Sequence, residues 1–173
     1  MYIIVGLGNP GEEYTHTRHN TGRVAAEFIS KSGNVNAKFI VPNAFMNKSG
    51  PAIAKAMAGK KTSNLIVVYD DIDLPLGTLK ISFNRSSGGH RGVESIIRTL
   101  KTESFIRIRI GITPTTPTGK IKKPKGEREV EKYILGKFKK SEEEILKKVF
   151  KRAAEAVQMI IAEGREKAMT RFN

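Results

Sequence analysis

The side chains with the clearest capacity for chemistry are a histidine and an aspartate that each follow a predicted strand. His19 lies in the Gly- and Pro-rich stretch 6–22, after the apolar run 2–5, and Asp70 directly follows the apolar run 65–69. Imidazole titrates near neutral pH, so it is the usual group for taking a proton from water. A carboxylate that accepts the second ring N–H would orient that imidazole and stabilise its charged form. The two residues therefore indicate a general base and its supporting carboxylate.

This pairing predicts metal-free hydrolysis by direct attack of water, because nothing in the arrangement supplies a nucleophilic side chain. Asn9 and Asn47 follow tight loop residues and are neutral donors suited to a substrate carbonyl and its developing oxyanion. Structural roles suit the same residues, namely a helix cap or surface ion pair for Asp70 and turn positions for the asparagines. Residue types alone leave both interpretations open.

A dinucleotide site is the first alternative, since Gly6-Leu7-Gly8-Asn9-Pro10-Gly11 satisfies G-x-G-x-x-G directly after a strand. The full fingerprint also needs a helix that the glycines open and an acidic residue at the end of the next strand. Residues 10–18 are polar and aperiodic, and the next predicted strand, 38–41, ends without an acid. We expect no nicotinamide or flavin cofactor.

A metal site is the second alternative, and it could use His16, His19, His90 and the aspartates at 70, 71 and 73. The aspartates lack the spacing of a calcium loop, because Pro75 stands two positions after Asp73 and no glycine occupies the sixth position from Asp71. His16 and His19 could share an ion only on a helix, which their loop does not resemble. We expect no metal.

Composition predicts one domain, residues 1–173, in the cytoplasm. The 173 residues are 39% hydrophobic and include no cysteine, which is compatible with a reducing compartment. No apolar run approaches the ~20 residues that cross a bilayer, and the N-terminus lacks the pattern of a secretion signal. We therefore expect neither a membrane partner nor export.

The charge is strongly positive, with 31 Lys and Arg against 17 Asp and Glu, or +14. Such a balance is typical of proteins that bind nucleic acid. A solvated basic surface without that function accounts for the charge equally well.

Strands alternate with helices along the chain, which predicts a three-layer α/β domain with a mixed, mostly parallel sheet. Strands are expected at 2–5, 38–41, 65–69, 78–83 and 105–112, with 65–69 central and 78–83 at an edge. Helices are expected at 23–31, 91–100 and 141–164, and after Ser49 through Pro51 in the first turn to Ala58. Ser49 is the expected N-cap of that helix, and Ser141 begins a capping box at the start of the last one. The prolines and lysines of residues 113–128 indicate a mobile basic loop. Residues 130–136 are expected to form a short ordered element.

Four motifs in order closely resemble the bacterial-type peptidyl-tRNA hydrolases. They are Gly6 to Gly11 with Tyr14 and Arg18-His19-Asn20, then 42–50 around Phe45-Met46-Asn47, then Tyr69 to Gly77, and Gly88-Gly89-His90. The resemblance implies cleavage of the ester between a peptide and its tRNA without a metal, by a protein that we expect to be a monomer. A non-catalytic RNA-binding protein on the same fold is the rival interpretation.

The resemblance also implies roles for single residues. His19 corresponds to the catalytic base, Asp70 to its carboxylate, and Asn9 to a residue that helps distinguish blocked from free aminoacyl-tRNA. The implied contacts with the peptide ester and the CCA end involve Asn47, Phe45, Tyr14, Asn20, Met46 and His90. Lys80 and Arg109 correspond to positions that bind phosphates of the acceptor backbone.

The chain departs from the family pattern at two places. Arg91 follows Gly-Gly-His where the family usually has Asn, and only eight residues separate Gly33 from Pro42, where the family usually has a further strand and turn. Positive charge at a helix start is unfavourable, so Arg91 needs a partner. We expect that partner to be the substrate, the alternatives being Asp71, Asp73 and Glu94.

Overall fold

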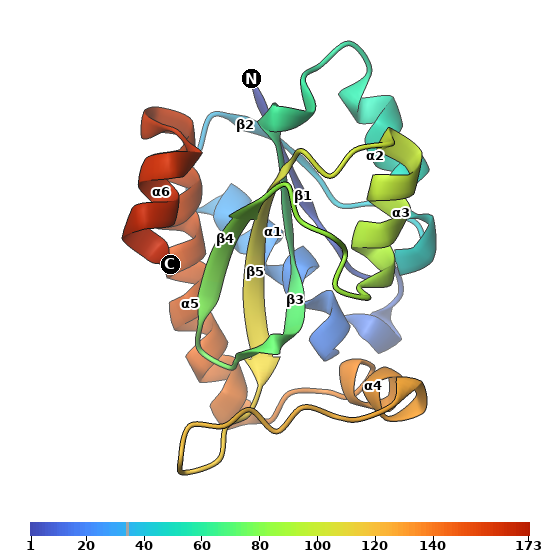
Figure 1. The fold of residues 1–173 in the computed structure, drawn as a ribbon, viewed down its shortest axis with the longest axis vertical. Coiled ribbons are helices and arrows are strands. Elements are labelled where there is room, and N and C mark those ends of the chain that lie inside the picture. Colours follow the sequence, from blue (N-terminus) through green and yellow to red (C-terminus); the bar gives the residue numbers. More distant parts are fainter. Residues whose placement is uncertain (34) are drawn as a thin grey trace.

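A computed structural model describes residues 1–33 and 35–173, which form one five-stranded sheet and six α-helices (Figure 1). The strands are β1 (Tyr2–Gly6), β2 (Ala37–Ile40), β3 (Leu65–Pro75), β4 (Leu79–Phe83) and β5 (Ile106–Thr113). Their order is β2-β1-β3-β5-β4, and all neighbours are parallel except β4, which pairs antiparallel with β5. The predicted mixed, mostly parallel sheet is confirmed, with β3 at its centre and β4 at its edge.

Helices cover both faces of this sheet (Figure 1). One face packs against α1 (Thr21–Lys31), α5 (Lys140–Glu163) and α6 (Arg165–Phe172), and the other against α2 (Ser49–Met57) and α3 (Arg91–Leu100). Successive strand residues enter opposite cores: Ile4 packs toward the first group of helices, while Ile3 and Val5 pack toward the second. The predicted three-layer α/β domain is confirmed.

The remaining helix, α4 (Glu127–Ile134), lies below the sheet in Figure 1, near the carboxyl ends of β3 and β5. None of its eight residues is buried. It corresponds to the short element expected at 130–136, and it includes the last two residues of the predicted basic loop. Before it, Thr115 and Ile121 form an antiparallel bridge; the mobility of 113–128 stays a prediction.

The central strand is longer than the sequence predicts. Apolar composition ends at Tyr69, yet β3 continues to Pro75 because Asp70 and Asp71 still pair with Ile110 and Gly111 of β5. A Cβ at Gly111 would lie 1.9 Å from the carbonyl oxygen of Pro75, so only glycine permits this close approach. Asp70 therefore lies within the strand, on a rigid backbone, and not beyond its end.

Two predicted helix caps are wrong. Ser49 is the first residue of α2, not its cap, and its Oγ donates a hydrogen bond to the Met46 carbonyl oxygen. Helix α5 begins at Lys140 with Lys139 as its cap, and the side chain of Glu142 accepts the Lys139 N–H at 2.7 Å. The sequence also gave no sign of α6, whose few apolar residues follow the break at Gly164.

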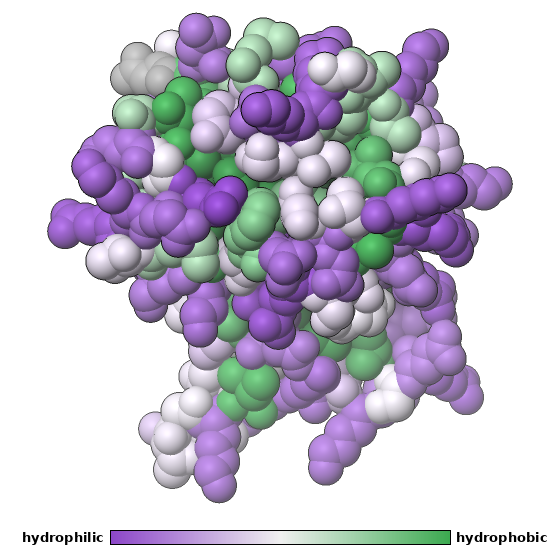
Figure 2. Space-filling model, turned by 45° about the horizontal axis from the view of Figure 1, so that its top comes forward, coloured by the Kyte–Doolittle hydropathy of each residue, from purple (hydrophilic) through white to green (hydrophobic). Residues whose placement is uncertain are grey.

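The surface is dominated by polar side chains. Figure 2 shows a face on which hydrophilic residues surround smaller apolar areas. No described helix has the length and apolarity that a membrane crossing requires.

Candidate active site

An open cleft of about 1060 Å³ lies at the carboxyl ends of β1 and β3. Its walls come from the loop after β1, the carboxyl half of β3, the turn before α3, and α4 with the segment that precedes it. In open α/β sheets, ligands bind outside the carboxyl ends of the strands. The predicted site residues that line this cleft are Asn9, Tyr14, His19, Phe45, Met46, Asn47, Asp70, His90, Arg91 and Arg109.

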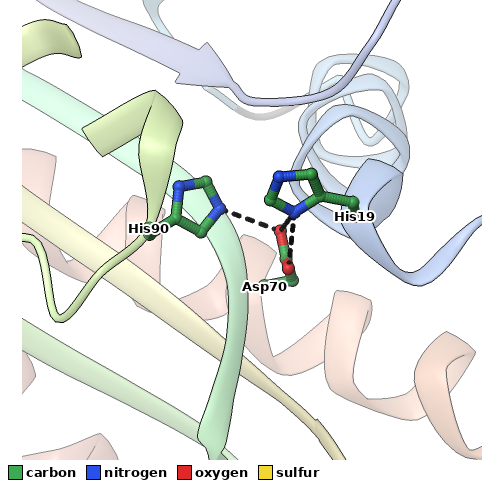
Figure 3. Close-up of side chains that lie close together, drawn as sticks. All are labelled: His19, Asp70 and His90. Carbon is green, nitrogen blue, oxygen red and sulfur yellow. Dashed lines mark hydrogen bonds and ion pairs between the residues drawn. The ribbon is translucent and has the colours of Figure 1, made fainter. Parts of the chain in front are cut away.

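His19 and Asp70 are in direct contact, as the sequence predicts (Figure 3). His19 Nδ1 lies 2.9 Å from Asp70 Oδ2 and 3.1 Å from Oδ1, and both residues are buried. Gly22 permits this approach, because a Cβ there would lie 2.1 Å from the Val68 carbonyl oxygen. Its bare backbone lets the first turn of α1 press on β3, and this places His19 beside Asp70.

The hydrogen bond assigns the tautomer of His19. An ionised carboxylate can only accept, so Nδ1 carries the proton and Nε2 keeps its lone pair. No described residue hydrogen-bonds to Nε2. The imidazole can therefore accept a proton at Nε2 while Asp70 holds the opposite side of the ring.

His90 binds the same carboxylate, which the sequence did not predict. Its Nε2 lies 3.0 Å from Asp70 Oδ1, and its Nδ1 accepts the backbone N–H of Val93 at 3.3 Å. The second bond caps α3 and leaves the ring proton on Nε2, which donates to Asp70. The rings of Tyr69 and His90 meet edge to face, with centroids 4.8 Å apart. These contacts make His90 a fixed support for the carboxylate.

The charge of Asp70 is stabilised by both imidazoles. Burial alone would raise the pKa of the Asp70 carboxyl, but the electrostatic attraction of His19 and His90 and the hydrogen bonds that their rings donate outweigh that effect. The pKa of Asp70 is therefore held well below its usual range, and the carboxylate stays ionised at neutral pH.

His19, Asp70 and His90 also place one ligand atom each within 4.8 Å of one another, a separation that a metal ion could bridge. A histidine that binds a metal through Nε2 normally carries its proton on Nδ1 and donates it to an acceptor. Here Nδ1 of His90 faces a donor, the N–H of Val93. A metal at Nε2 would thus break the α3 cap or require an imidazolate. The donor set suits a hydrogen-bond network better than a metal.

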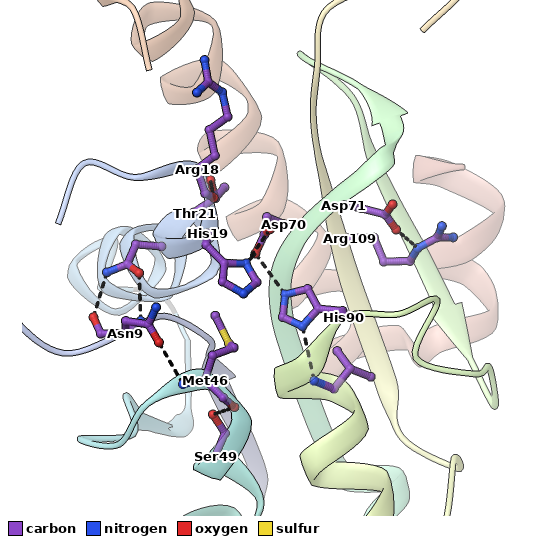
Figure 4. A network of polar contacts seen from close by, with 12 residues as sticks. Asn9, Arg18, His19, Thr21, Met46, Ser49, Asp70, Asp71, His90 and Arg109 are labelled. Carbon is purple, nitrogen blue, oxygen red and sulfur yellow. Dashed lines mark hydrogen bonds and ion pairs between the residues drawn. The ribbon is translucent and has the colours of Figure 1, made fainter. Parts of the chain in front are cut away.

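The asparagines form a second network beside the first (Figure 4). Asn9 Oδ1 accepts the N–H of Met46 at 2.8 Å, which leaves the Asn9 NH2 group as the donor for a ligand. Asn20 pairs with both backbone groups of Asn9, at 2.8 and 2.9 Å. It is 1% exposed and does not line the cleft. Asn20 thus holds the Asn9 loop in place.

Aromatic and amide groups occupy the rim. Phe45 is 53% exposed and meets Tyr14 edge to face, with centroids 6.3 Å apart. Asn47 is exposed one residue beyond the buried Met46. This rim offers an apolar surface and an amide to a flat or extended ligand.

The two residues expected at phosphates lie in different settings. Arg109 is 6% exposed, and its Nε donates to Asp71 at 2.7 Å while Nη1 donates to Ser82 at 3.2 Å. Lys80 is its neighbour across the β4–β5 pair and is exposed outside the cleft. Lys80 is therefore accessible to a phosphate, whereas Arg109 is held by its own partners.

Arg91 has a partner that was not among the protein groups expected for it. Its Nη2 lies 2.9 Å from Glu127 of α4, and both side chains are exposed. Asp71 pairs instead with Arg109, and Asp73 with Lys123. The alternative to a substrate partner, a pair with Asp71, Asp73 or Glu94, does not form among the described residues. The sequence did not show that the start of α4 reaches the mouth of the cleft. Contact of Arg91 with the substrate stays a prediction.

The family model described as peptidyl-tRNA hydrolase matches residues 3–39 and 30–173. The two matched ranges overlap at residues 30–39, in the same part of the chain as the short segment between Gly33 and Pro42. Curated relatives named peptidyl-tRNA hydrolase include one from Sulfurihydrogenibium sp. (38% identical, covering 98% of this chain and 96% of the relative) and one from Carboxydothermus hydrogenoformans (40%, covering 100% and 98%).

Solved structures agree with these matches. The crystal structure of peptidyl-tRNA hydrolase from Acinetobacter baumannii superposes with a TM-score of 0.88 at 25% identity, covering 100% of this chain and 94% of that one. The endopeptidase HycI from Escherichia coli superposes with a TM-score of 0.52 at 12% identity. That second likeness concerns the fold alone.

Proposed function

The chain belongs to the peptidyl-tRNA hydrolase family, and we propose that His19, supported by Asp70, is the general base of its reaction. The protein hydrolyses the ester bond between a peptide and tRNA and so releases the tRNA for reuse. The observation that carries the residue assignment is the 2.9 Å contact between His19 Nδ1 and Asp70, with Nε2 left without a protein partner among the described residues. This is the arrangement that activation of a water molecule requires.

The reaction proceeds in two proton transfers. A water molecule attacks the ester carbonyl carbon as His19 Nε2 takes its proton, and Asp70 stabilises the imidazolium that forms. The amide NH2 groups of Asn9 and Asn47 donate to the carbonyl oxygen as it becomes negative. The bond to the ribose oxygen then breaks, and the imidazolium returns its proton to that leaving oxygen. The products are a peptide carboxylic acid, which loses its remaining proton to solvent, and a tRNA with a free terminal ribose hydroxyl.

The substrate is held by features that every tRNA shares. The exposed Phe45 beside Tyr14 suits stacking against an unpaired base of the CCA end, because bases of any identity present a flat face. Cations on the cleft wall without an ion pair among the described residues are Lys48, Arg85 and Lys125. They favour the backbone of a polyanion, and Lys80 extends that attraction outside the cleft. His90, Met46 and Asn20 contribute indirectly by positioning Asp70 and Asn9.

Metal independence, a monomeric state and a cytoplasmic location complete the proposal. The first is supported by the bond from Val93 to His90, which leaves no lone pair on His90 Nε2. A non-catalytic RNA-binding role is disfavoured by the intact pairing of His19 with Asp70.

Release of labelled peptide from diacetyl-lysyl-tRNA, with EDTA present, tests the proposal. We expect full activity in EDTA. Binding of the tRNA without release would favour a non-catalytic role, and loss of activity that added divalent cation restores would show a metal requirement.

A further inference from the structure

Arg18 directly precedes His19, and its side chain points away from Asp70 and His90 (Figure 4). It reaches the C-terminal end of α4. Its guanidinium lies 4.3 Å from the centre of the Tyr133 ring and 5.3 Å from that of Phe138. Nη1 donates to the Tyr133 carbonyl oxygen at 3.3 Å, and Nη2 lies 3.5 Å from Glu142 at the start of α5. The side chain is 12% exposed, so these partners enclose it.

Backbone hydrogen bonds also join the residues around Arg18 to the turn that follows α4. The Arg18 N–H donates to the Gly136 carbonyl oxygen at 3.0 Å, and Thr17 forms an antiparallel bridge with Lys137. A Cβ at Gly136 would lie 2.7 Å from Arg18 Nη1. The guanidinium therefore occupies space that any larger residue at this turn would enter.

These contacts matter because α4 has few other side-chain contacts among the described residues. None of its residues is buried, and a segment with few buried contacts is among the first to open. Apart from Arg18, its described attachments include the exposed pair of Arg91 with Glu127 and the hydrogen bond from the Tyr133 hydroxyl to the Ile112 carbonyl oxygen. Meanwhile Val130, Ile134 and Leu135 line the cleft.

On the His19 side, Arg18 is fixed to α1. The Thr21 hydroxyl donates to the Arg18 carbonyl oxygen at 2.7 Å, and Thr21 begins the helix that presses on β3. One residue thus joins two walls of the cleft: the turn that carries His19 and the α4 wall opposite.

We propose that Arg18 is a positioning residue for hydrolysis, which sets the distance between His19 and the α4 wall and so the place of the ester relative to Nε2. It acts through His19 and α4 and does not touch the substrate. This inference rests on the proposed role of His19 as the base. Lysine cannot replace arginine here, because the planar guanidinium both stacks on Tyr133 and donates in two directions.

Two variants test this from opposite sides. Arg18→Lys keeps the charge but loses the stacking, whereas Gly136→Ala keeps the arginine but displaces it. Arg165→Lys is the matched control, because Arg165 stacks 3.7 Å from the ring centre of Phe83 and pairs with Glu166 on α6, away from the cleft. The measurements are kcat and KM for diacetyl-lysyl-tRNA, thermal unfolding, and the NMR signal of the His19 Nδ1 proton.

Arg18→Lys and Gly136→Ala are both expected to lower kcat by about tenfold or more with little change in KM. Displacements of about 1 Å in an active site lower the rate by up to ~10²-fold. The His19 signal should shift in both, and Arg165→Lys should match the wild type in all kinetic readouts. A wild-type kcat in folded Arg18→Lys or folded Gly136→Ala would overturn the inference. An equal loss of kcat in Arg165→Lys would also overturn it. If Arg18→Lys does not fold, Gly136→Ala decides the question. Full activity in His19→Ala would instead refute the proposed function itself.

Discussion

His90 Nε2 donates a hydrogen bond to Oδ1 of Asp70 at 3.0 Å, and the same carboxylate accepts the hydrogen bond from His19 Nδ1. The two imidazoles lie side by side, with ring centroids 4.8 Å apart. Because the cap bond from Val93 fixes the ring of His90, the carboxylate cannot rotate without losing a partner. Asp70 is therefore oriented from two sides before the substrate arrives.

This relationship predicts a catalytic cost for losing His90. His90→Ala should lower kcat by about tenfold with KM nearly unchanged, since Asp70 would be less well oriented. It should also lower the free energy of unfolding by about 1 kcal/mol through loss of the α3 cap. Steady-state kinetics and denaturant unfolding measure the two effects. His16→Ala, at a histidine whose side chain is 68% exposed, is the control and should change neither; unchanged kcat in His90→Ala would refute the positioning role.

The depressed pKa of Asp70 predicts that the stability of the folded protein depends on pH. Its pKa is lower in the folded protein than in the unfolded chain, so its ionised form stabilises the fold at pH values above the unfolded pKa of ~3.9. That stabilisation is lost as the pH falls below this value toward the folded pKa. Asp70→Asn removes it, so we expect the variant to be less stable at pH 7 by on the order of 2 kcal/mol. The difference should shrink in urea unfolding at pH 3; a constant difference from pH 7 to pH 3 would contradict the depressed pKa.

The ion pair of Arg91 with Glu127 predicts opposite changes in KM when one or the other residue is replaced. If Arg91 meets the substrate, Arg91→Asn should raise KM for the tRNA with kcat largely intact. Glu127→Gln should lower KM because it frees the arginine. Neither should change thermal stability much, since exposed pairs contribute about 0–1 kcal/mol. A lower melting temperature in Arg91→Asn with unchanged kinetics would show that the arginine serves the fold.

Lys80 predicts a change in the salt dependence of tRNA binding. If it meets one phosphate, Lys80→Ala should reduce the magnitude of the slope of log K against log salt by roughly one unit. Arg109→Ala should act differently and destabilise the protein, because it strips the partly buried Asp71 of its partner. Binding measured from low to high salt checks the first claim. An unchanged slope in Lys80→Ala would place the tRNA elsewhere, and the Lys120–Lys125 segment would be the next to test.

The sequence predicted those features that depend on local pattern. Apolar runs located all five strands, and helical periodicity located the main helices. The contact of His19 with Asp70 was expected because both were predicted to follow strands of one sheet, although Asp70 in fact lies within β3. The bond from His90 to Asp70 was not, because the position of a Gly-Gly turn relative to a strand depends on tertiary packing.

The long-range contacts of Arg18 and Arg91 could not be predicted from the sequence, because they too depend on tertiary packing. Arg18 meets Tyr133, and Arg91 meets Glu127, across separations that no periodicity spans. The full length of β3 was missed because pairing with β5, and not apolar composition, extends it. Helix α6 is short and largely polar, so its sequence carries little helical signal.

Peptide release from diacetyl-lysyl-tRNA by His19→Ala, at saturating substrate and with EDTA present, tests the central claim most directly. Loss of a general base should reduce kcat by ~10²–10⁴-fold while binding of the tRNA persists, because the cations that attract the backbone remain. Turnover by His19→Ala at the wild-type rate would contradict the assignment of His19 as the base.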